Sequence, residues 1–268
     1  MDIIDNLVRL KFDQVWKTEI LDKSDLKKVD NPKGYVLGGQ PGAGKSKILK
    51  SIGLKHNLNV VIVNADDYRK YHPNYKEFQK NFIENSPKYT ALFSAKMTEA
   101  IIKKALDERY NIAIEGTFRT SETPINTLKI LKEAGYKTIV AIQTCDKEIS
   151  WKSCLERYNK ALKINPLLAR YTDKNHHDLV VKNLAKNIKV VKDSGLVDNL
   201  KIFTRTLSKD NTFEQKLIFD SNIDKNLDIK AINKYLGVDE NLENLNAKKE
   251  MKNNNSLSSN SNTYKLKI

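Results

Sequence analysis

The feature that most restricts the fold of this chain is a glycine-rich segment with the sequence GQPGAGKS. It fits the phosphate-binding pattern G-x-x-x-x-G-K-[ST] at every defined position, and its residues are Gly39, Gln40, Pro41, Gly42, Ala43, Gly44, Lys45 and Ser46. The glycines let backbone N–H groups converge on phosphate oxygens, and a helix that starts here adds a favourable dipole. We expect Lys45 to reach the β- and γ-phosphates of a nucleotide and Ser46 to hold Mg²⁺.

The segment lies between a predicted strand and a predicted helix, which is the context that the pattern requires. Residues 35–37 form an apolar strand that runs into the glycines, and residues 45–54 are predicted to be helical. Hydrophobic periodicity predicts the remaining elements: strands at 59–63, 112–114, 137–143 and 201–205, and helices at 3–21, 90–109, 124–134, 148–162, 176–193 and 227–236. This alternation predicts an α/β, P-loop NTPase kinase-like fold, with helices flanking a mainly parallel central sheet.

Composition divides the chain into three segments. We expect residues 1–30 to form an N-terminal helical segment, residues 31–240 the kinase domain, and the Asn-, Ser- and Lys-rich residues 241–268 a flexible tail. No apolar run approaches the roughly 20 residues that span a bilayer, and the sequence MDIIDNLVRLKF does not resemble a signal peptide. Cys145 and Cys154 have no metal-ligand spacing, so we expect reduced thiols. A cytoplasmic protein that does not bind membranes is therefore predicted.

The formal net charge of the chain is +14. Its lysines are scattered, and no arginine-rich or aromatic-interleaved stretch marks a nucleic-acid surface. We therefore expect no nucleic-acid partner. The charge favours phosphorylated ligands or an acidic protein partner.

Two aspartates follow the predicted strand at 59–63. In open α/β sheets, ligands bind beyond the carboxyl ends of the strands, so Asp66 and Asp67 face the expected site. A kinase that acts on a hydroxyl group benefits from a carboxylate that accepts the departing proton. One aspartate can serve as this base while the other caps the following helix. The spacing alone does not say which is which.

The predicted strand at 112–114 delivers further polar side chains to the same edge, in the sequence EGTFRT. Glu115 is suited to orient Mg²⁺ or its waters, and Thr117 and Arg119 are suited to bind an acceptor. A polar turn after a strand would account for Gly116, but not for the clustering of glutamate, threonine and arginine.

Two more arginines, Arg157 and Arg170, stand on a predicted helix and on the loop after it. Such a pair can form a lid whose guanidinium groups neutralise the charge that develops on a transferred phosphoryl group. Lone arginines are usually surface residues, so the pair by itself is a weak signal. His176 and His177 are adjacent and suit no simple metal site, so we interpret them as structural.

Taken together, these segments resemble the zeta toxin family of bacterial toxin–antitoxin systems, especially its chromosomal pneumococcal-type branch. The similarity extends from about Val36 to about Leu184. It depends on an ordered series of motifs: LGGQPGAGKS, NADDYRKYHP, FSAKMTEAI, IEGTFRT, ERYNKALKINPLLAR and the HHD that follows. The resemblance implies a P-loop kinase that uses ATP and Mg²⁺ to phosphorylate the 3′-hydroxyl of the sugar of UDP-N-acetylglucosamine and thereby inhibits cell-wall synthesis. It also implies a small helical epsilon-type antitoxin that obstructs the nucleotide site.

The resemblance also implies roles for individual residues. Lys45 and Ser46 match the phosphate-loop ligands, and Asp66 matches the catalytic base. The acceptor contacts would be Glu99, Thr117 and Arg119, the arginines on the ATP phosphates Arg157 and Arg170, and a supporting acidic residue Glu115. Asn64 stands where many members have an aspartate, so support of the base by that carboxylate is expected to be missing or changed.

Two other functions fit the same residues. A P-loop kinase for another small-molecule or polynucleotide hydroxyl would share Lys45, Ser46 and Asp66 but differ around Glu99, Thr117 and Arg119. A nucleotide-dependent binding switch would need no base, so replacing Asp66 by asparagine would leave it intact.

Overall fold

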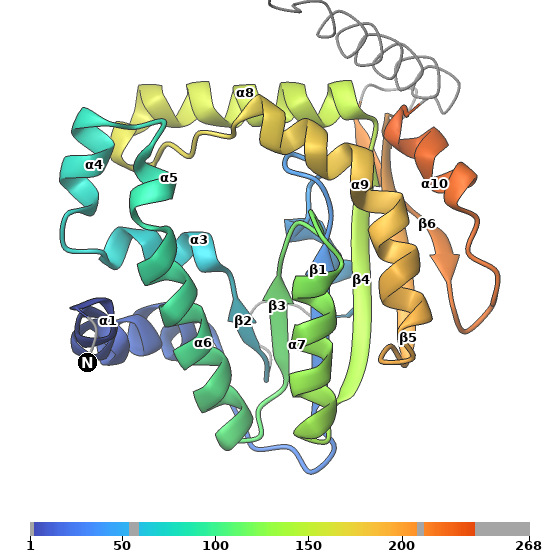
Figure 1. Cartoon of the computed structure of the whole chain (residues 1–268), viewed down its shortest axis with the longest axis horizontal. Coiled ribbons are helices and arrows are strands. Elements are labelled where there is room, and N and C mark those ends of the chain that lie inside the picture. Colours follow the sequence, from blue (N-terminus) through green and yellow to red (C-terminus); the bar gives the residue numbers. More distant parts are fainter. Residues whose placement is uncertain (1–2, 54–58, 208–211, 239–268) are drawn as a thin grey trace, which may run out of the picture.

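The core of the fold is a six-stranded sheet with the strand order β2-β3-β1-β4-β5-β6 (Figure 1). The computed structural model describes residues 3–53, 59–207 and 212–238. The strands are β1 (Lys33–Gly38), β2 (Val61–Val63), β3 (Ile112–Glu115), β4 (Lys137–Cys145), β5 (Asn199–Leu207) and β6 (Phe213–Asp220). All neighbouring pairs from β2 to β5 are parallel, and β6 runs antiparallel to β5. This confirms the predicted α/β class with a mainly parallel sheet.

Helices precede or connect most of the strands. The α-helices are α1 (Ile3–Val15), α2 (Ser46–Ser51), α3 (Ala65–Tyr68), α4 (Tyr75–Asn81), α5 (Ser86–Tyr89), α6 (Ala91–Asp107), α7 (Glu122–Glu133), α8 (Lys147–Ile164), α9 (Lys174–Asp193) and α10 (Ile229–Leu236). Single turns of other helix types are η1 (Trp16–Ile20), η2 (Leu21–Lys23), η3 (Arg69–Tyr71) and η4 (Pro166–Leu168). Within the described ranges, no helix is both long and apolar enough to cross a membrane.

The predicted elements are present, with shifted ends. β1 begins at Lys33, two residues before the start of the strand predicted at 35–37. β2 begins at Val61, two residues after the start of the strand predicted at 59–63. The helix after the glycine-rich segment ends at Ser51 instead of extending to residue 54, which lies outside the described residues. The prediction of a flexible tail at 241–268 also falls outside them.

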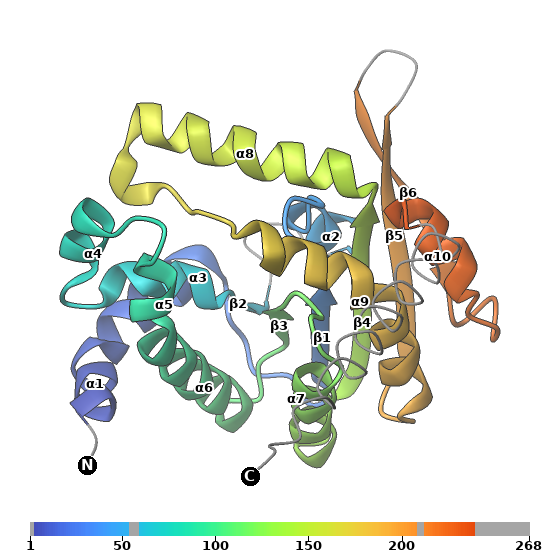
Figure 2. The same cartoon turned by 45° about the horizontal axis from the view of Figure 1, so that its top comes forward.

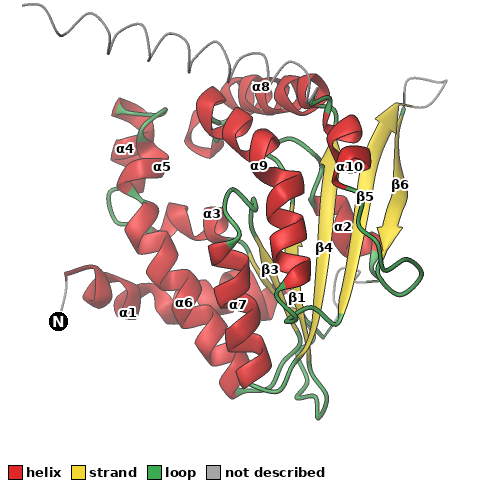
Figure 3. Cartoon of the chain, turned by 45° about the vertical axis from the view of Figure 1, so that its right-hand side comes forward, coloured by secondary structure: helices red, strands yellow, loops and turns green. Residues whose placement is uncertain are grey.

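Helices lie on both sides of the sheet (Figure 3), and the side chains on its two faces belong to two apolar clusters. Val36 of β1 belongs to a large cluster with α6, α7, α9 and α10. Its neighbours Tyr35 and Leu37 belong to a smaller cluster with Ile48 of α2. This alternation follows from the two-residue period of a strand, which sends successive side chains to opposite faces. The sheet is therefore held rigidly between helices, and its carboxyl edge is left for the loops.

The N-terminal helix α1 packs on α6, and the π-helical turn η1 that follows it carries a buried carboxylate. The side chain of Glu19 is only 3% exposed and forms ion pairs with Lys23 and Lys70, the second at 2.7 Å. Tyr71 donates its hydroxyl to Glu19 Oε1 at 2.6 Å. Burial alone would raise the pKa of Glu19, but these hydrogen bonds and charges outweigh it and lower the pKa to about 2. Glu19 thereby joins the N-terminal segment to η3.

We expect Glu19→Gln to lower the free energy of unfolding by about 2–3 kcal/mol at pH 7. Because the folded-state pKa of about 2 lies below the ordinary value of 4.5, the carboxylate contributes its full stability above about pH 4.5 and loses it as the pH falls toward 2. Urea unfolding at several pH values should show the two proteins converging over that range. Glu108→Gln, which removes an exposed pair with Lys104, should change stability little at any pH. A constant deficit for Glu19→Gln down to pH 2 would contradict the role of this charge.

Candidate active site

The glycine-rich loop lies between β1 and α2, and two of its glycines have contacts that no other residue allows. Gly39 and Gly42 have φ angles of +139° and +77°. A Cβ atom would lie 2.0 Å from the carbonyl oxygen of Gln143 at Gly39, and 2.0 Å from that of Ser150 at Gly42. The loop is thus fitted closely against β4 and the first turns of α8. These contacts leave no room for a side chain at either glycine.

Lys45 folds back over this loop. Its Nζ atom donates to the carbonyl oxygens of Gly39 and Gln40, at 3.0 and 3.2 Å. Gln40 in turn donates its side-chain amide to the carbonyl of Cys145 at the end of β4, at 2.5 Å. Ser46 is exposed at the first position of α2. The ammonium and hydroxyl groups that the pattern assigns to phosphate and Mg²⁺ therefore lie at the same helix start.

The charged groups around Lys45 come from three other segments: α8, the end of β3 and the short helix α3 after β2. Burial lowers the pKa of Lys45, Arg157 adds to this effect, and the carboxylates of Glu115 and Asp66 oppose it. Burial raises the pKa of Glu115, with a further rise from Asp66, while Lys45 opposes it. Because these charged groups lie close enough to shift each other's pKa values, the ends of β2 and β3, the phosphate loop and α8 meet at one site. The predicted residues Lys45, Asp66, Glu115 and Arg157 are thus brought together.

Asp66 lies in the first turn of the short helix α3, directly after β2. Asn64 caps this helix, because its side-chain oxygen accepts the backbone N–H of Asp66 at 3.1 Å. The Asp66 carboxyl group is 51% exposed, and its Oδ1 atom accepts a hydrogen bond from Arg69 Nε at 2.8 Å. Burial alone would raise the pKa of Asp66, but Arg69, Arg170 and Arg157 outweigh it and hold the pKa below its ordinary value. The group is therefore an ionised, accessible carboxylate.

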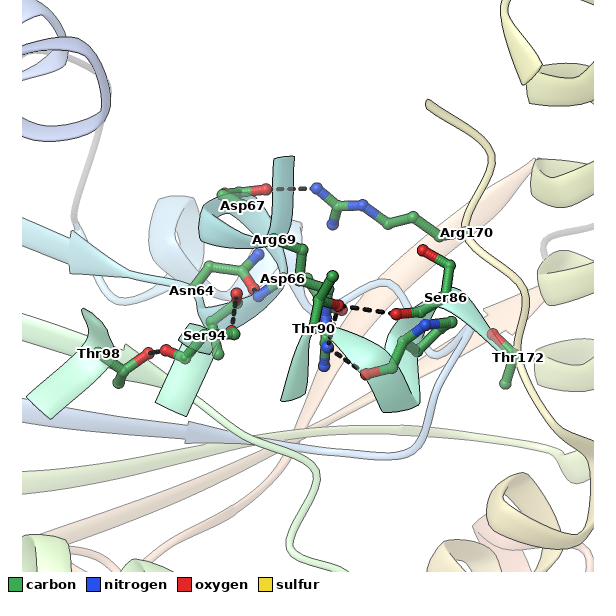
Figure 4. A network of polar contacts seen from close by, with 12 residues as sticks. Asn64, Asp66, Asp67, Arg69, Ser86, Thr90, Ser94, Thr98, Arg170 and Thr172 are labelled. Carbon is green, nitrogen blue, oxygen red and sulfur yellow. Dashed lines mark hydrogen bonds and ion pairs between the residues drawn. The ribbon is translucent and has the colours of Figure 1, made fainter. Parts of the chain in front are cut away.

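Asp67 is not a helix cap, so the alternative in which one of the two aspartates caps the helix is wrong. Its Oδ1 atom forms an ion pair with Arg170 Nη2 at 2.5 Å (Figure 4). Because Asn64 already caps α3, and asparagine caps as well as aspartate does, the difference at Asn64 costs the helix nothing. Arg170 thus lies against the segment that carries Asp66.

The loop after β3 carries Thr117 and Arg119. It is held by Asn187 of α9, whose side-chain amide donates to the carbonyl oxygens of Phe118 and Arg119, at 2.9 Å each. Phe118 is buried and has a φ angle of +57°, an uncommon conformation for a bulky residue. Strained residues that their surroundings hold in place are frequent at functional sites. Thr117 and Arg119 therefore follow Glu115 in a fixed loop.

Glu99 lies on an exposed position of α6. The hydroxyl of Ser94, on the same helix, donates to the carbonyl of Ala65 and ties α6 to α3. Among the residues that the structure describes, Glu99 forms no hydrogen bond or ion pair with the other predicted site residues. Glu99 is therefore placed near the site only because α6, the helix that carries it, is held against α3.

The two arginines of the predicted lid lie on an arm, residues 147–173, that comprises α8, η4 and the extended chain leading back to α9 (Figure 2). Arg157 Nη2 donates to Thr172 Oγ1 at 3.4 Å, across the two sides of the arm. The far end is fastened to α4. Tyr75 donates to the carbonyl of Leu167 at 3.0 Å, and Gln79 donates to the carbonyls of Leu167 and Ala169 at 3.1 and 3.0 Å. The arm therefore bridges the sheet and the α3–α6 region.

His177 is fully buried where α9 meets α8, which agrees with a structural role. Its Nε2 atom lies 2.8 Å from the hydroxyl oxygen of Ser150, and its ring packs on Trp151 with centroids 5.4 Å apart. Because the Ser150 carbonyl is the group that closes over Gly42, these contacts set the distance between α8 and the loop. His176 faces the site side, where burial and Arg119 lower its pKa.

The two cysteines are free and buried. Burial raises the pKa of Cys145 to about 11 and also raises that of Cys154, so both are protonated near neutral pH. In the part of the chain that the structure describes, no group of three or more His, Cys, Asp and Glu residues could hold a metal ion.

The contacts that five residues make at the site were not predicted from the sequence, although the sequence singles out two of these residues, Asp67 and Asn64. They are the ion pair of Asp67 with Arg170, the helix cap at Asn64, the hydrogen bond from Arg69 to Asp66, and the hydrogen bonds by which Asn187 and Gln79 hold the loop after β3 and the arm. A signal existed for two of them. Asn64 stands directly before the acidic helix start, and Arg69 stands three positions after Asp66, which is the spacing of neighbours on a helix.

The fold and this site define a nucleotide-binding α/β protein with a phosphate loop, carboxylates at the carboxyl edge of the sheet and an arginine-bearing arm. Comparison with known proteins gives the family: the zeta toxin family model matches residues 17–223, and the chain belongs to that family.

Curated relatives include Toxin zeta of Streptococcus agalactiae, 37% identical over 177 residues that cover 66% of this chain and 62% of the relative. Toxin PezT of Streptococcus pneumoniae serotype 4 (strain ATCC BAA-334 / TIGR4) is 37% identical over 186 residues, or 68% of this chain and 74% of that protein. The match to the S. agalactiae protein thus spans less than two thirds of its length.

Solved structures show the same fold. A structure of the PezAT chromosomal toxin–antitoxin system of Streptococcus pneumoniae matches with a TM-score of 0.71 and 27% identity, over 96% of this chain and 98% of that one. A structure of the AvrRxo1-ORF1:-ORF2 complex matches with a TM-score of 0.59 over 88% of this chain and 72% of that one, at 14% identity. The second similarity bears on the fold alone.

Proposed function

We propose that this protein is a toxin kinase that transfers the γ-phosphoryl group of ATP to the 3′-hydroxyl of the sugar of UDP-N-acetylglucosamine. The observation that carries the proposal is the ionised, half-exposed carboxylate of Asp66, which shares one site with the phosphate-loop residue Lys45 and with two arginines. Membership of the zeta toxin family supports the same activity. Phosphorylation of this precursor would inhibit cell-wall synthesis.

In the proposed reaction Asp66 is the general base. Its Oδ1 atom is engaged by Arg69, which leaves Oδ2 to accept the proton of the sugar hydroxyl. The hydroxyl oxygen then forms a bond to the γ-phosphorus, the bond from that phosphorus to the β–γ bridging oxygen breaks, and ADP leaves. The lowered pKa of Asp66 keeps it unprotonated at neutral pH.

The transferred phosphoryl group would be held by cations. We assign Lys45 to the β- and γ-phosphates, for which Nζ leaves the carbonyls of Gly39 and Gln40. Arg157 and Arg170 would neutralise the charge that develops during transfer. The Ser46 hydroxyl and the Glu115 carboxylate are oxygen donors of the kind that Mg²⁺ prefers. When bound there, Mg²⁺ would supply positive charge that neutralises the phosphate oxygens.

The acceptor would occupy the space between α6 and the loop after β3. In this proposal Glu99 contacts the sugar nucleotide from α6, and Thr117 and Arg119 contact it from the loop that Asn187 holds. An epsilon-type helical antitoxin that covers the nucleotide site is the proposed partner. Similarity to the toxin–antitoxin system of S. pneumoniae supports this partner, and so does the net charge of +14, which favours an acidic protein.

We expect Gln79→Leu to lower kcat/KM for ATP about 10-fold, mainly through KM. The substitution removes two hydrogen bonds to the carbonyls of Leu167 and Ala169, each worth about 1 kcal/mol, and so loosens the chain that positions Arg170. Gln14→Leu, on an exposed position of α1, is the matched control and should leave the kinetics unchanged. Equal kinetics for both variants would show that the arm needs no such fastening.

The proposed function is tested by incubating the purified protein with ATP, Mg²⁺ and UDP-N-acetylglucosamine and following the sugar nucleotide by mass spectrometry. We expect the addition of one phosphate, and NMR of the product should place it on the 3′-oxygen. UDP-glucose, which lacks the acetamido group, serves as the comparison acceptor. An unmodified sugar nucleotide, together with consumption of ATP when other hydroxyl compounds are supplied, would contradict the assigned acceptor but retain the kinase.

A further inference from the structure

Arg69 lies at the site, but it belongs neither to the phosphate loop, nor to the proposed acceptor contacts, nor to the arm. Its guanidinium group makes three directed contacts (Figure 4). Nε donates to Asp66 Oδ1 at 2.8 Å, and Nη1 donates to the carbonyl of Pro87 at 2.6 Å and to Thr90 Oγ1 at 3.0 Å. The side chain is only 23% exposed, less than half the exposure of Asp66. Its position is therefore set by α5 and the start of α6, and not by Asp66 alone.

These contacts restrict the carboxylate that they reach. A free aspartate side chain rotates about two bonds, and a base on a short surface helix would sample several orientations. Thr90 is fully buried and donates its own hydroxyl to the Ser86 carbonyl at 2.9 Å. The guanidinium group is thus anchored to buried atoms at one end and holds Oδ1 at the other. Planar guanidinium groups suit such multiple fixed contacts better than a lysine ammonium group does.

We infer that Arg69 is the positioning residue of this site: anchored to Pro87 and Thr90, it holds Oδ1 of Asp66 so that Oδ2 faces the acceptor hydroxyl. The inference deepens the proposed function and rests on it, because Asp66 acts there as the base. It also gives α5 and α6 a joint role. Helix α6 is proposed to carry the acceptor contact Glu99, and Thr90 at its start anchors the residue that orients the base. One helix would thus position both the acceptor and the base.

Arg69 is not the only charge that Asp66 faces. Arg170 and Arg157 reach it from the arm, Lys45 from the phosphate loop, and Glu115 from the end of β3. Asp67 is its neighbour in α3, and Tyr75 faces it from α4. Of these groups, only Arg69 forms a hydrogen bond with the carboxylate. Loss of Arg69 should therefore change both the orientation and the titration of Asp66, whereas the loss of a more distant cation should change less.

The first test needs no substrate. The side-chain carboxyl carbon of Asp66 is followed by ¹³C NMR during a pH titration of the unliganded protein, with Asp66→Asn to assign the signal. We expect Arg69→Gln to shift the titration of Asp66 upward by about 1–2 pH units, the usual effect of losing an adjacent opposite charge. Lys70→Gln removes one positive charge at the next position, where the lysine pairs with Glu19 instead. This control should leave the titration in place.

The second test separates positioning from charge. Arg69→Lys keeps a cation but cannot make the three contacts at once. We therefore expect its titration to stay near that of the wild type, while its kcat falls about 10-fold with KM for the acceptor nearly unchanged. Thr90→Val removes one anchor and should lower kcat about 3-fold or more. Thr90→Ser, which keeps the hydroxyl, should restore it. Circular dichroism and the melting temperature identify any variant that fails to fold.

The outcomes distinguish this inference from the proposed function. The inference would be overturned if the titration of Asp66 did not move in a folded Arg69→Gln variant. It would also be overturned if the Arg69→Lys variant and the Thr90→Val variant both had the wild-type kcat. If the wild-type protein leaves UDP-N-acetylglucosamine unmodified, the proposed function fails. The kinetic arms are then measured with the hydroxyl acceptor that the protein does phosphorylate, and the NMR arm stands by itself.

Discussion

Replacing Asp66 by asparagine is expected to abolish phosphoryl transfer while leaving the fold and ATP binding intact. Asparagine has nearly the same shape and still accepts a hydrogen bond from Arg69, but it cannot take up the proton of the acceptor. General-base catalysis contributes about 10²–10⁴-fold to rate, so kcat should fall by at least 100-fold with KM for ATP within about 3-fold. Quenched-flow or coupled-enzyme assays measure the rate, and calorimetry measures ATP binding.

The neighbouring aspartate provides a matched control. Asp67→Asn makes the same chemical change one position away and removes the ion pair with Arg170. Because that pair lies partly in solvent, we expect a modest effect, seen mainly in KM for ATP, from the altered position of Arg170. If Asp66→Asn kept more than a tenth of the wild-type rate, or if Asp67→Asn were the more damaging change, Asp66 would not be the base.

Gly42→Ala is expected to weaken nucleotide binding strongly and to destabilise the protein. A Cβ atom at this position would lie 2.0 Å from the Ser150 carbonyl oxygen and 2.9 Å from the sulfur of Cys154. Because both contacts are closer than atoms can approach, either α8 or the phosphate loop must move. We expect a loss of ATP affinity of about 100-fold, equivalent to about 3 kcal/mol, and a lower melting temperature.

Gly135 separates this contact from backbone strain. It has the same φ angle of +77° as Gly42, but nothing lies within 4 Å of its Cβ position. Gly135→Ala should therefore cost only the strain of a left-handed residue, about 1–2 kcal/mol, with unchanged ATP affinity. Calorimetric binding and thermal unfolding of both variants give the comparison. Equal losses in the two would mean that strain, and not the contact with α8, explains Gly42.

The sequence was most informative where short-range rules apply. Strand–loop–helix order around Lys45 predicted the phosphate loop, and the rule that ligands bind at the carboxyl edge predicted that Asp66 and Glu115 would meet there. Hydrophobic periodicity found the long helices because each buries one face. Family resemblance chose Asp66 over Asp67, which the residues alone had not done.

The remaining features depend on contacts between distant segments. The pairing of Arg170 with Asp67 joins residues 103 positions apart, and the hold of Asn187 on Phe118 joins residues 69 apart; no local pattern encodes either. β6 was not predicted because its sequence, FEQKLIFD, groups three polar residues and then three apolar ones, so this edge strand from Phe213 to Asp220 shows no two-residue alternation. The helices α3, α4 and α5 are too short for a periodic signal, with lengths of 4, 7 and 4 residues.

Because Cys154 is buried under the phosphate loop, the rate at which its thiol is alkylated should report how often the site opens. Alkylating reagents attack the thiolate, and burial both hides the sulfur and keeps it protonated. Modification can therefore proceed only as fast as α8 separates from the loop. A bound nucleotide that holds the arm in place would slow that separation. The alkylation rate of Cys154 would therefore measure how often the candidate active site opens, without any added label.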